Sequence, residues 1–286
     1  MVPNKMNTLN RIFTRNTLRQ FIEEKSDSTY ISLVKRYILN PETKNNRELI
    51  SEIYCELKDN YRNEYFYKNT LLNKLLLGVH SINTTTALTE VPVAKSKADF
   101  ILINGKAVVY EIKTELDNFD RLETQIYDYY KVFDHVAVVT CNENLVALEK
   151  KIENINLPIG IYILKKNGKL STIRKPGQYT GFLDMEIMFK LLRKPEYESI
   201  LKEKYRCLPD VTQFRYYSEC KKLFLNIAQN EAYLLVLKQL KKRTILEKED
   251  FIKVPYELKF LTYFMDLKKE DYQNLDIFLH QEYRGA

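Results

Sequence analysis

The chain has 286 residues, of which 45% are hydrophobic and 29% are charged, a composition typical of a globular protein with a sizeable core and not of a disordered chain. Its net charge of +7 favours polyanionic partners without demanding them. No apolar run approaches the roughly 18 residues that span a bilayer, and no signal-peptide pattern follows the basic N-terminus. We therefore expect a cytoplasmic protein that does not enter a membrane.

The four cysteines and three histidines argue against two kinds of site. Cys55, Cys141, Cys207 and Cys220 lie far apart and form no C-x-x-C pair, and no histidine stands at metal-ligand spacing from a cysteine. Neither a zinc site nor a disulfide framework is expected.

The spacing of apolar residues changes twice along the chain. Apolar residues recur at three- and four-residue spacing at both ends of the chain, which predicts helices there. Between about Leu88 and Arg174 the texture changes to short β-rich runs such as "ADFILI", "AVVYEIK" and "HVAVVT". This pattern predicts a layered α/β (α+β) core flanked by helices. The predicted division is an N-terminal helical region at 1–69, a core at 70–175 and a C-terminal helical region at 176–286.

Inside the core, helices alternate with strands in a definite order. The predicted elements are a helix at about 70–79, strands at about 88–93, 98–103 and 107–113, a helix at 117–133 and a strand at 134–140. Asp99, Glu111 and Lys113 stand in or beside these strands, where charged residues are scarce. Three such charges therefore call for a functional explanation.

The turn between the second and third strands decides whether these charges meet. A two-residue Asn104-Gly105 turn sends Asp99 to the face opposite Glu111. A three-residue loop with a bulge at Gly105 instead places Asp99 opposite Val109 or Glu111, and the charges then converge. Both registers are open at this point, and only the second builds a site.

Two carboxylates on adjacent strands suit Mg²⁺, which takes one or two carboxylates together with water and substrate phosphates. Mn²⁺ accepts the same ligands and is expected to substitute. Such a metal polarises a phosphoryl oxygen and activates water, while Lys113 orients the nucleophile or stabilises transition-state charge. The alternative to a metal site is an ion pair without catalytic function on a solvated edge strand.

At these residues the chain resembles the PD-(D/E)xK (restriction-endonuclease-like) nuclease superfamily. Asp99, eleven intervening residues and then Glu111-Ile112-Lys113 resemble its D…ExK motif, with Ala98 in place of the proline before the aspartate. The order of elements is similar to the family's αβββαβ core. More narrowly, "YEIKTELDNFDRLETQIYDYYKVFDHVAVV" resembles the sce7726-type bacterial nuclease-like proteins.

The resemblance implies a role for each site residue. Asp99, Glu111 and Ile112 would bind the metal, and Lys113 would assist the nucleophilic water. The segment "QIYDY" resembles the QxxxY element of RecB-like members, whose glutamine and tyrosine fall at Gln125 and Tyr129 here, and Gln125 is expected to reach the edge of the site as a further catalytic residue. The following candidates complete the set: Glu90 as a further acidic ligand, and Arg121 and Tyr129 as nucleic-acid contacts.

Three functions follow from these residues. The first is a Mg²⁺-dependent nuclease that hydrolyses phosphodiester bonds, with DNA as the favoured substrate and a homo-oligomer as an open alternative to a monomer. The second is a catalytically inactive nucleic-acid-binding or assembly protein on the same scaffold. The third is a protein-interaction module dominated by the helical flanks, which Asp99 and Glu111 on opposite sheet faces would favour.

Overall fold

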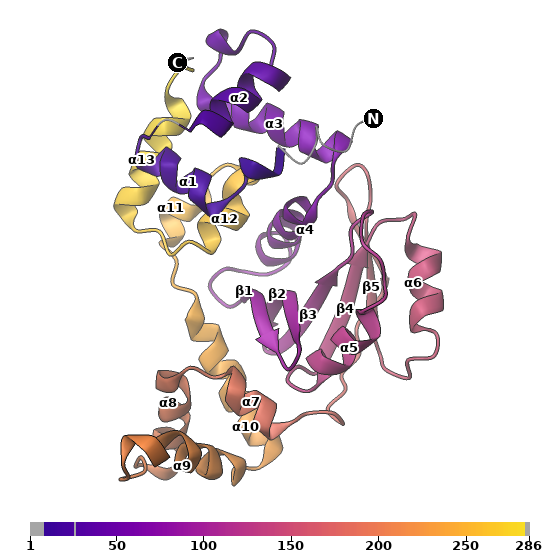
Figure 1. The fold of residues 1–286 in the computed structure, drawn as a ribbon, viewed down its shortest axis with the longest axis vertical. Coiled ribbons are helices and arrows are strands. Elements are labelled where there is room, and N and C mark those ends of the chain that lie inside the picture. Colours follow the sequence, from indigo (N-terminus) through magenta and orange to yellow (C-terminus); the bar gives the residue numbers. More distant parts are fainter. Residues whose placement is uncertain (1–8, 26, 284–286) are drawn as a thin grey trace. The chain divides into compact units, whose positions relative to one another are not determined.

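The computed structural model describes residues 9–25 and 27–283 (Figure 1). They form two compact units. Unit 1 comprises the described parts of 1–83, 164–170 and 244–286, and unit 2 comprises 84–163 and 171–243. No helix in the described ranges combines the length and apolarity needed to cross a membrane. These units differ from the three consecutive regions predicted from sequence texture, because the two ends of the chain pack together.

Unit 1 is helical. Its elements are η2 (Leu9–Arg11), α1 (Arg15–Ile22), α2 (Ser28–Tyr37), η3 (Pro41–Thr43), α3 (Asn46–Asn60), α4 (Glu64–Leu71), the π-helical η4 (Leu72–Leu77), α11 (Lys248–Lys253), η6 (Tyr256–Leu258), α12 (Lys259–Tyr263) and α13 (Lys269–His280). The rings of Phe21 and Phe278 stack with centroids 4.4 Å apart. The Asn46 side chain donates to the Phe278 carbonyl oxygen at 2.9 Å. These contacts join the first helices to the last.

Unit 2 is a mixed α/β structure. Its strands are β1 (Thr86–Val93), β2 (Ser96–Asn104), β3 (Lys106–Ile112), β4 (His135–Thr140), β5 (Gly160–Leu164) and β6 (Leu170–Arg174), in the spatial order β1-β2-β3-β4-β5-β6. Pairing is antiparallel from β1 to β3 and parallel from β3 to β5. The helices that connect the parallel strands are α5 (Leu122–Tyr130) and α6 (Leu145–Ile152). The predicted mixed α/β fold class is thus observed.

The sheet face under α5 forms the centre of the core. Leu122, Ile126 and Tyr129 of α5 are fully buried in one cluster with alternate residues of β2, β3 and β4. This is the 3.6-residue repeat of a helix laid on the two-residue repeat of strands. On the other face, Tyr110 contacts the rings of Phe100 and Tyr162. Residues 107–112 of β3 are buried on both faces of the strand, so a charge on this part of β3 needs polar partners.

The remaining helices of unit 2 follow the sheet: α7 (Met185–Leu191), α8 (Lys194–Tyr205), α9 (Gln213–Leu225), α10 (Gln229–Leu240) and η5 (Lys241–Arg243). Two polar contacts hold this group. Asp134, the residue before β4, accepts from the Tyr233 hydroxyl of α10 at 2.6 Å. Arg243 donates to both carboxylate oxygens of Glu196 at 2.6 and 2.7 Å, a bidentate geometry that fixes orientation.

Candidate active site

The hairpin between β2 and β3 has the register that the charges require. Asn104 pairs with Lys106 across Gly105, which has φ +72°, a conformation that glycine adopts without steric cost. Ile101 pairs with Val109, and the regular pairing ends at Phe100 and Tyr110. Continuing that register places Asp99 opposite Glu111. The odd-length connection is therefore confirmed, and the two-residue turn is excluded.

Asp99 sits where the ladder between β2 and β3 stops. Its Oδ2 accepts the main-chain N–H of Ile112 at 2.8 Å, the position that a carbonyl oxygen occupies in a continuing ladder. Its own carbonyl accepts from the Thr89 hydroxyl at 2.7 Å. In a strand the N–H and C=O of one residue point to the same edge, so the Ile112 carbonyl also faces the Asp99 side.

Glu90 of β1 joins this end of the sheet. It has φ +55° and lies between the pairs Thr89–Phe100 and Val91–Ala98, which places it opposite Asp99. The two carboxylates each bring an oxygen within 4.8 Å of the other's. Glu90 also forms an ion pair with Lys97. The register thus aligns Glu90, Asp99 and Glu111 across three adjacent strands.

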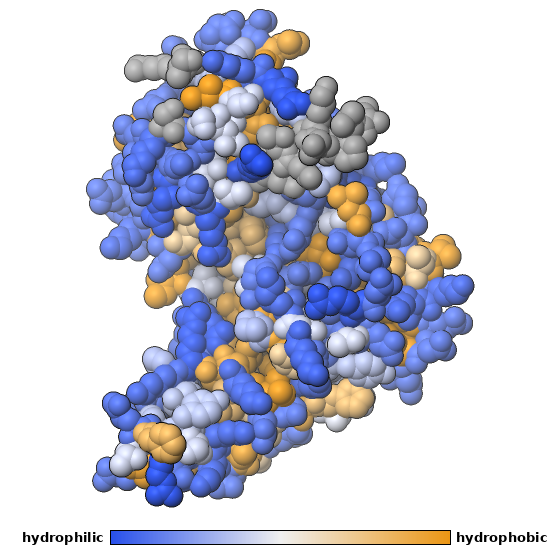
Figure 2. Space-filling model, viewed as in Figure 1, coloured by the Kyte–Doolittle hydropathy of each residue, from blue (hydrophilic) through white to orange (hydrophobic). Residues whose placement is uncertain are grey.

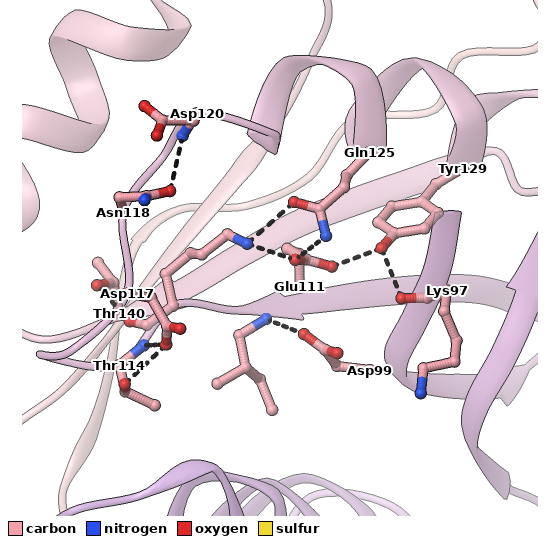
Figure 3. A network of polar contacts seen from close by, with 12 residues as sticks. Lys97, Asp99, Glu111, Thr114, Asp117, Asn118, Asp120, Gln125, Tyr129 and Thr140 are labelled. Carbon is pink, nitrogen blue, oxygen red and sulfur yellow. Dashed lines mark hydrogen bonds and ion pairs between the residues drawn. The ribbon is translucent and has the colours of Figure 1, made fainter. Parts of the chain in front are cut away.

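Glu111 is the centre of a buried network at the end of β3 (Figure 3). Its side chain is 1% exposed. Oε1 accepts from Lys113 Nζ at 2.8 Å and from Gln125 Nε2 at 2.5 Å, and Oε2 accepts from the Tyr129 hydroxyl at 2.6 Å. The Gln125 Oε1 in turn accepts from Lys113 Nζ at 2.9 Å. A buried carboxylate needs such donors, because an uncompensated charge in the interior is costly.

Tyr129 connects this network to β2. Its hydroxyl lies 2.9 Å from the Lys97 carbonyl oxygen as well as 2.6 Å from Glu111, so its one hydrogen serves one acceptor at a time. Burial, together with the Glu111 and Asp99 carboxylates, raises the pKa of Tyr129 above its ordinary value. The phenol consequently stays protonated and remains a donor.

The segment after β3 is fixed by its own polar contacts. Asp117 Oδ2 accepts from both the main-chain N–H and the hydroxyl of Thr114, at 2.8 and 2.7 Å. The Thr140 hydroxyl of β4 donates to the Lys113 carbonyl at 2.7 Å. These bonds hold the main chain at Lys113 to a neighbouring strand and to a tight turn, and its side chain reaches Glu111 and Gln125.

The structure therefore brings some predicted residues together and reassigns others. Glu111, Lys113, Gln125 and Tyr129 form one hydrogen-bonded group, and Asp99 attaches to the same strand one residue from Glu111. Tyr129 is fully buried. Its hydroxyl donates to Glu111, and its contact with nucleic acid stays a prediction. Arg121 is exposed at the start of α5.

The donors at this site fit a hard divalent cation. They are carboxylate and carbonyl oxygens, which Mg²⁺ and Mn²⁺ prefer. An ionised carboxylate offers about four acceptor positions, and the three donors on Glu111 leave Oε2 with room for one more partner. Asp99, Glu111 and the Ile112 carbonyl could hold such a metal, and Glu90 has a carboxylate oxygen within 4.8 Å of one of Asp99. Glu90, Asp99 and Glu111 do not all lie within that distance of one another.

The family model of "Bacteriophage P4 protein cII" matches residues 57–266. The chain belongs to this family. The family region contains every site residue described above, from Glu90 to Tyr129. No curated protein matches the chain. Among solved structures, the "SPO1766 protein of unknown function from Silicibacter pomeroyi" is similar at 13% identity and a TM-score of 0.29, over 43% of this chain and 82% of that one.

Two features of the site were not predicted from the sequence. The first is the main-chain N–H of Ile112 as the partner of Asp99, for which the sequence carries no local signal. The second is Asp128, whose Oδ2 accepts from the Ser96 hydroxyl at 2.8 Å and from the Lys95 N–H at 3.2 Å. A polar residue on the buried side of an amphipathic helix was the available signal, and Asp128 ties α5 to the β1–β2 turn.

Proposed function

We propose that this chain is a metal-dependent nuclease that hydrolyses phosphodiester bonds, with DNA as the favoured substrate and a restriction-endonuclease-like core. The observation that carries the proposal is the hydrogen bond from Ile112 N–H to Asp99, one residue from Glu111 and Lys113. This hydrogen bond places the Asp99 carboxylate beside the end of the strand that carries Glu111, Ile112 and Lys113. The order of helix, three strands, helix and strand from α4 to β4 also supports the proposal.

Each residue of the site has a distinct role in this proposal. Asp99, Glu111 and the Ile112 carbonyl supply oxygen ligands. A bound Mg²⁺ supplies Lewis acidity toward water and toward a phosphoryl oxygen. Lys113, held by Glu111 and Gln125, donates toward the nucleophile or toward charge that develops on the phosphate. Tyr129 acts through Glu111 and is a positioning residue.

The test is a cleavage assay of the full chain on linear, circular and branched DNA and on RNA, with Mg²⁺, Mn²⁺ or EDTA. We expect cleavage with either metal, none in EDTA, and a loss of at least about a hundredfold in Lys113→Ala, since a general acid–base group contributes typically 10²–10⁴-fold. The exposed Lys150→Ala on α6 is the matched control. Equal cleavage by wild type and Lys113→Ala, or no cleavage of any substrate, contradicts the proposal.

One observation favours a second function. Both oxygens of Glu111 are engaged by Lys113, Gln125 and Tyr129 within a buried group, an arrangement that also suits a purely structural role. The corresponding function is a catalytically inactive nucleic-acid-binding or assembly protein. It predicts salt-sensitive DNA binding that survives Asp99→Ala, in a protein that cleaves nothing.

A further inference from the structure

Helix α9 exposes a stripe of large side chains. Residues three, four, seven and eleven apart share one face of a helix. In α9 that face carries Phe214, Tyr217, Ser218, Lys221 and Leu225, which we call the α9 stripe. Phe214 is 97% exposed and Tyr217 is 48% exposed. Figure 2 shows hydrophobic side chains set among hydrophilic ones over α9.

The opposite face of α9 fixes the orientation of this stripe. Cys220 and Phe224 are fully buried in the core of unit 2, and the Phe224 ring lies 5.3 Å from that of Phe189. The Tyr217 ring borders the same cluster, 5.2 Å from Phe189 and 6.1 Å from Tyr197. Tyr217 is therefore a supported ring with one open side, and Phe214 stands one turn from it, exposed to solvent.

Basic residues border the stripe. Arg215 and Lys222 are exposed, and helical geometry places them together on one side of it. Residues 176–243, which contain the stripe, carry 13 basic and 8 acidic side chains. Lys222 pairs with Glu219, but an exposed ion pair contributes little and exchanges readily for another anion. Helix α9 itself carries three basic residues, Arg215, Lys221 and Lys222, and one acidic residue, Glu219, and Lys221 pairs with Glu186 at 2.9 Å.

Exposed aromatic rings beside positive charge are what single-stranded nucleic acid requires, because bases stack on the rings and phosphates lie along the basic side chains. We propose that the α9 stripe binds single-stranded nucleic acid, with Phe214 and Tyr217 as stacking platforms and Arg215 and Lys222 as phosphate contacts. This proposal rests on the proposed function in one respect only, that the ligand is a nucleic acid. The charge favours a polyanion over an apolar protein segment.

The experiment measures the anisotropy of a fluorescent pyrimidine-rich oligonucleotide, single-stranded or annealed to its complement, in EDTA so that metal-dependent cleavage plays no part. The proteins are the full chain, Phe214→Ala, Phe214→Trp and Arg215→Gln. Leu234→Ala, which removes another exposed apolar side chain of unit 2, is the matched control. Sedimentation of each protein alone reports self-association.

We expect the single strand to bind more tightly than the duplex and Phe214→Ala to weaken it by about tenfold, the loss of one stacked base. Phe214→Trp and Leu234→Ala should bind like wild type, and Arg215→Gln should lower the salt dependence. The proposal is overturned if Phe214→Ala binds the single strand as tightly as wild type, or if wild type binds the duplex as tightly as the single strand. It is also overturned if the protein self-associates and Phe214→Ala abolishes this self-association without changing the binding of the oligonucleotide. Binding without cleavage overturns only the nuclease function, and cleavage without binding at the stripe overturns only this inference.

Discussion

The hydroxyl of Tyr129 lies 2.6 Å from Oε2 of Glu111, and this hydrogen bond joins the buried face of α5 to the end of β3. It sets both the position and the environment of the carboxylate. Because Gln125 stands one turn earlier on the same helix and donates to Oε1, α5 holds Glu111 by both oxygens. The helix thus acts as a clamp on the site and not only as a cover for the sheet.

Replacing Tyr129 by phenylalanine tests that clamp. Tyr129→Phe removes the donor to Glu111 and to the Lys97 carbonyl, and leaves buried acceptors with one partner fewer. We expect the free energy of unfolding in urea to fall by about 1–3 kcal/mol. Tyr127→Phe, on the same helix and outside this network, is the control and should change it by less than about 0.5 kcal/mol. Equal effects of the two substitutions would show that Tyr129 contributes packing alone.

Gly105 tests the register of the hairpin. Its φ of +72° is strained for residues with a side chain, yet a Cβ at this position meets nothing within 4 Å. Gly105→Ala should therefore lower the free energy of unfolding by about 1–2 kcal/mol through backbone strain alone. Gly105→Asn should cost less, because asparagine tolerates the left-handed region. Urea unfolding measures both, and a Gly105→Ala protein as stable as wild type would mean that this turn adopts another conformation at no cost.

Lys259 gives a pH prediction in unit 1. Burial lowers the pKa of Lys259 from 10.5 to about 8, although its Nζ donates to the Phe251 and Ile252 carbonyls at 2.6 and 2.8 Å. Between these two pH values the unfolded chain holds the proton and the folded chain does not. Stability from this group therefore rises as pH increases from about 8 to 10.5.

The measurement is the difference in the free energy of unfolding between wild type and Lys259→Met, taken at pH 7 and at pH 10. Other titrating groups cancel in this difference. We expect the free energy of unfolding of wild type, relative to that of the variant, to rise by on the order of 1–3 kcal/mol between pH 7 and pH 10. A difference that stays constant with pH would show that Lys259 keeps its ordinary pKa, because the carbonyl acceptors and the Phe251 ring then offset its burial.

Much of the site could be predicted from the sequence because strand and helix periodicities are local. Alternation places Glu111 and Lys113 on one face of β3, and the four-residue spacing of Gln125 and Tyr129 places both on one side of α5. Whether the turn at Gly105 has an even or an odd number of residues then decides on which face of the sheet Asp99 lies. The bond from Ile112 N–H to Asp99 could not be predicted, because it exists only where the ladder ends.

The arrangement of the helical ends could not be predicted for a different reason. Contacts such as the stacking of Phe21 on Phe278 join residues far apart in the chain, and amphipathic spacing tells which face is buried but not against what. The same limit applies to α9. Its spacing predicts a helix, but the near-complete exposure of Phe214 follows from how α7, α8 and α10 pack against the other face.

The most direct test of the central claim is a crystal structure of the full chain soaked in Mn²⁺, with anomalous difference density measured at the end of β3. The account predicts one strong peak held by the carboxylates of Asp99 and Glu111, absent in Asp99→Ala crystals soaked in the same way. It is contradicted if wild-type crystals show no peak there and Glu111 remains bound by Lys113, Gln125 and Tyr129 alone.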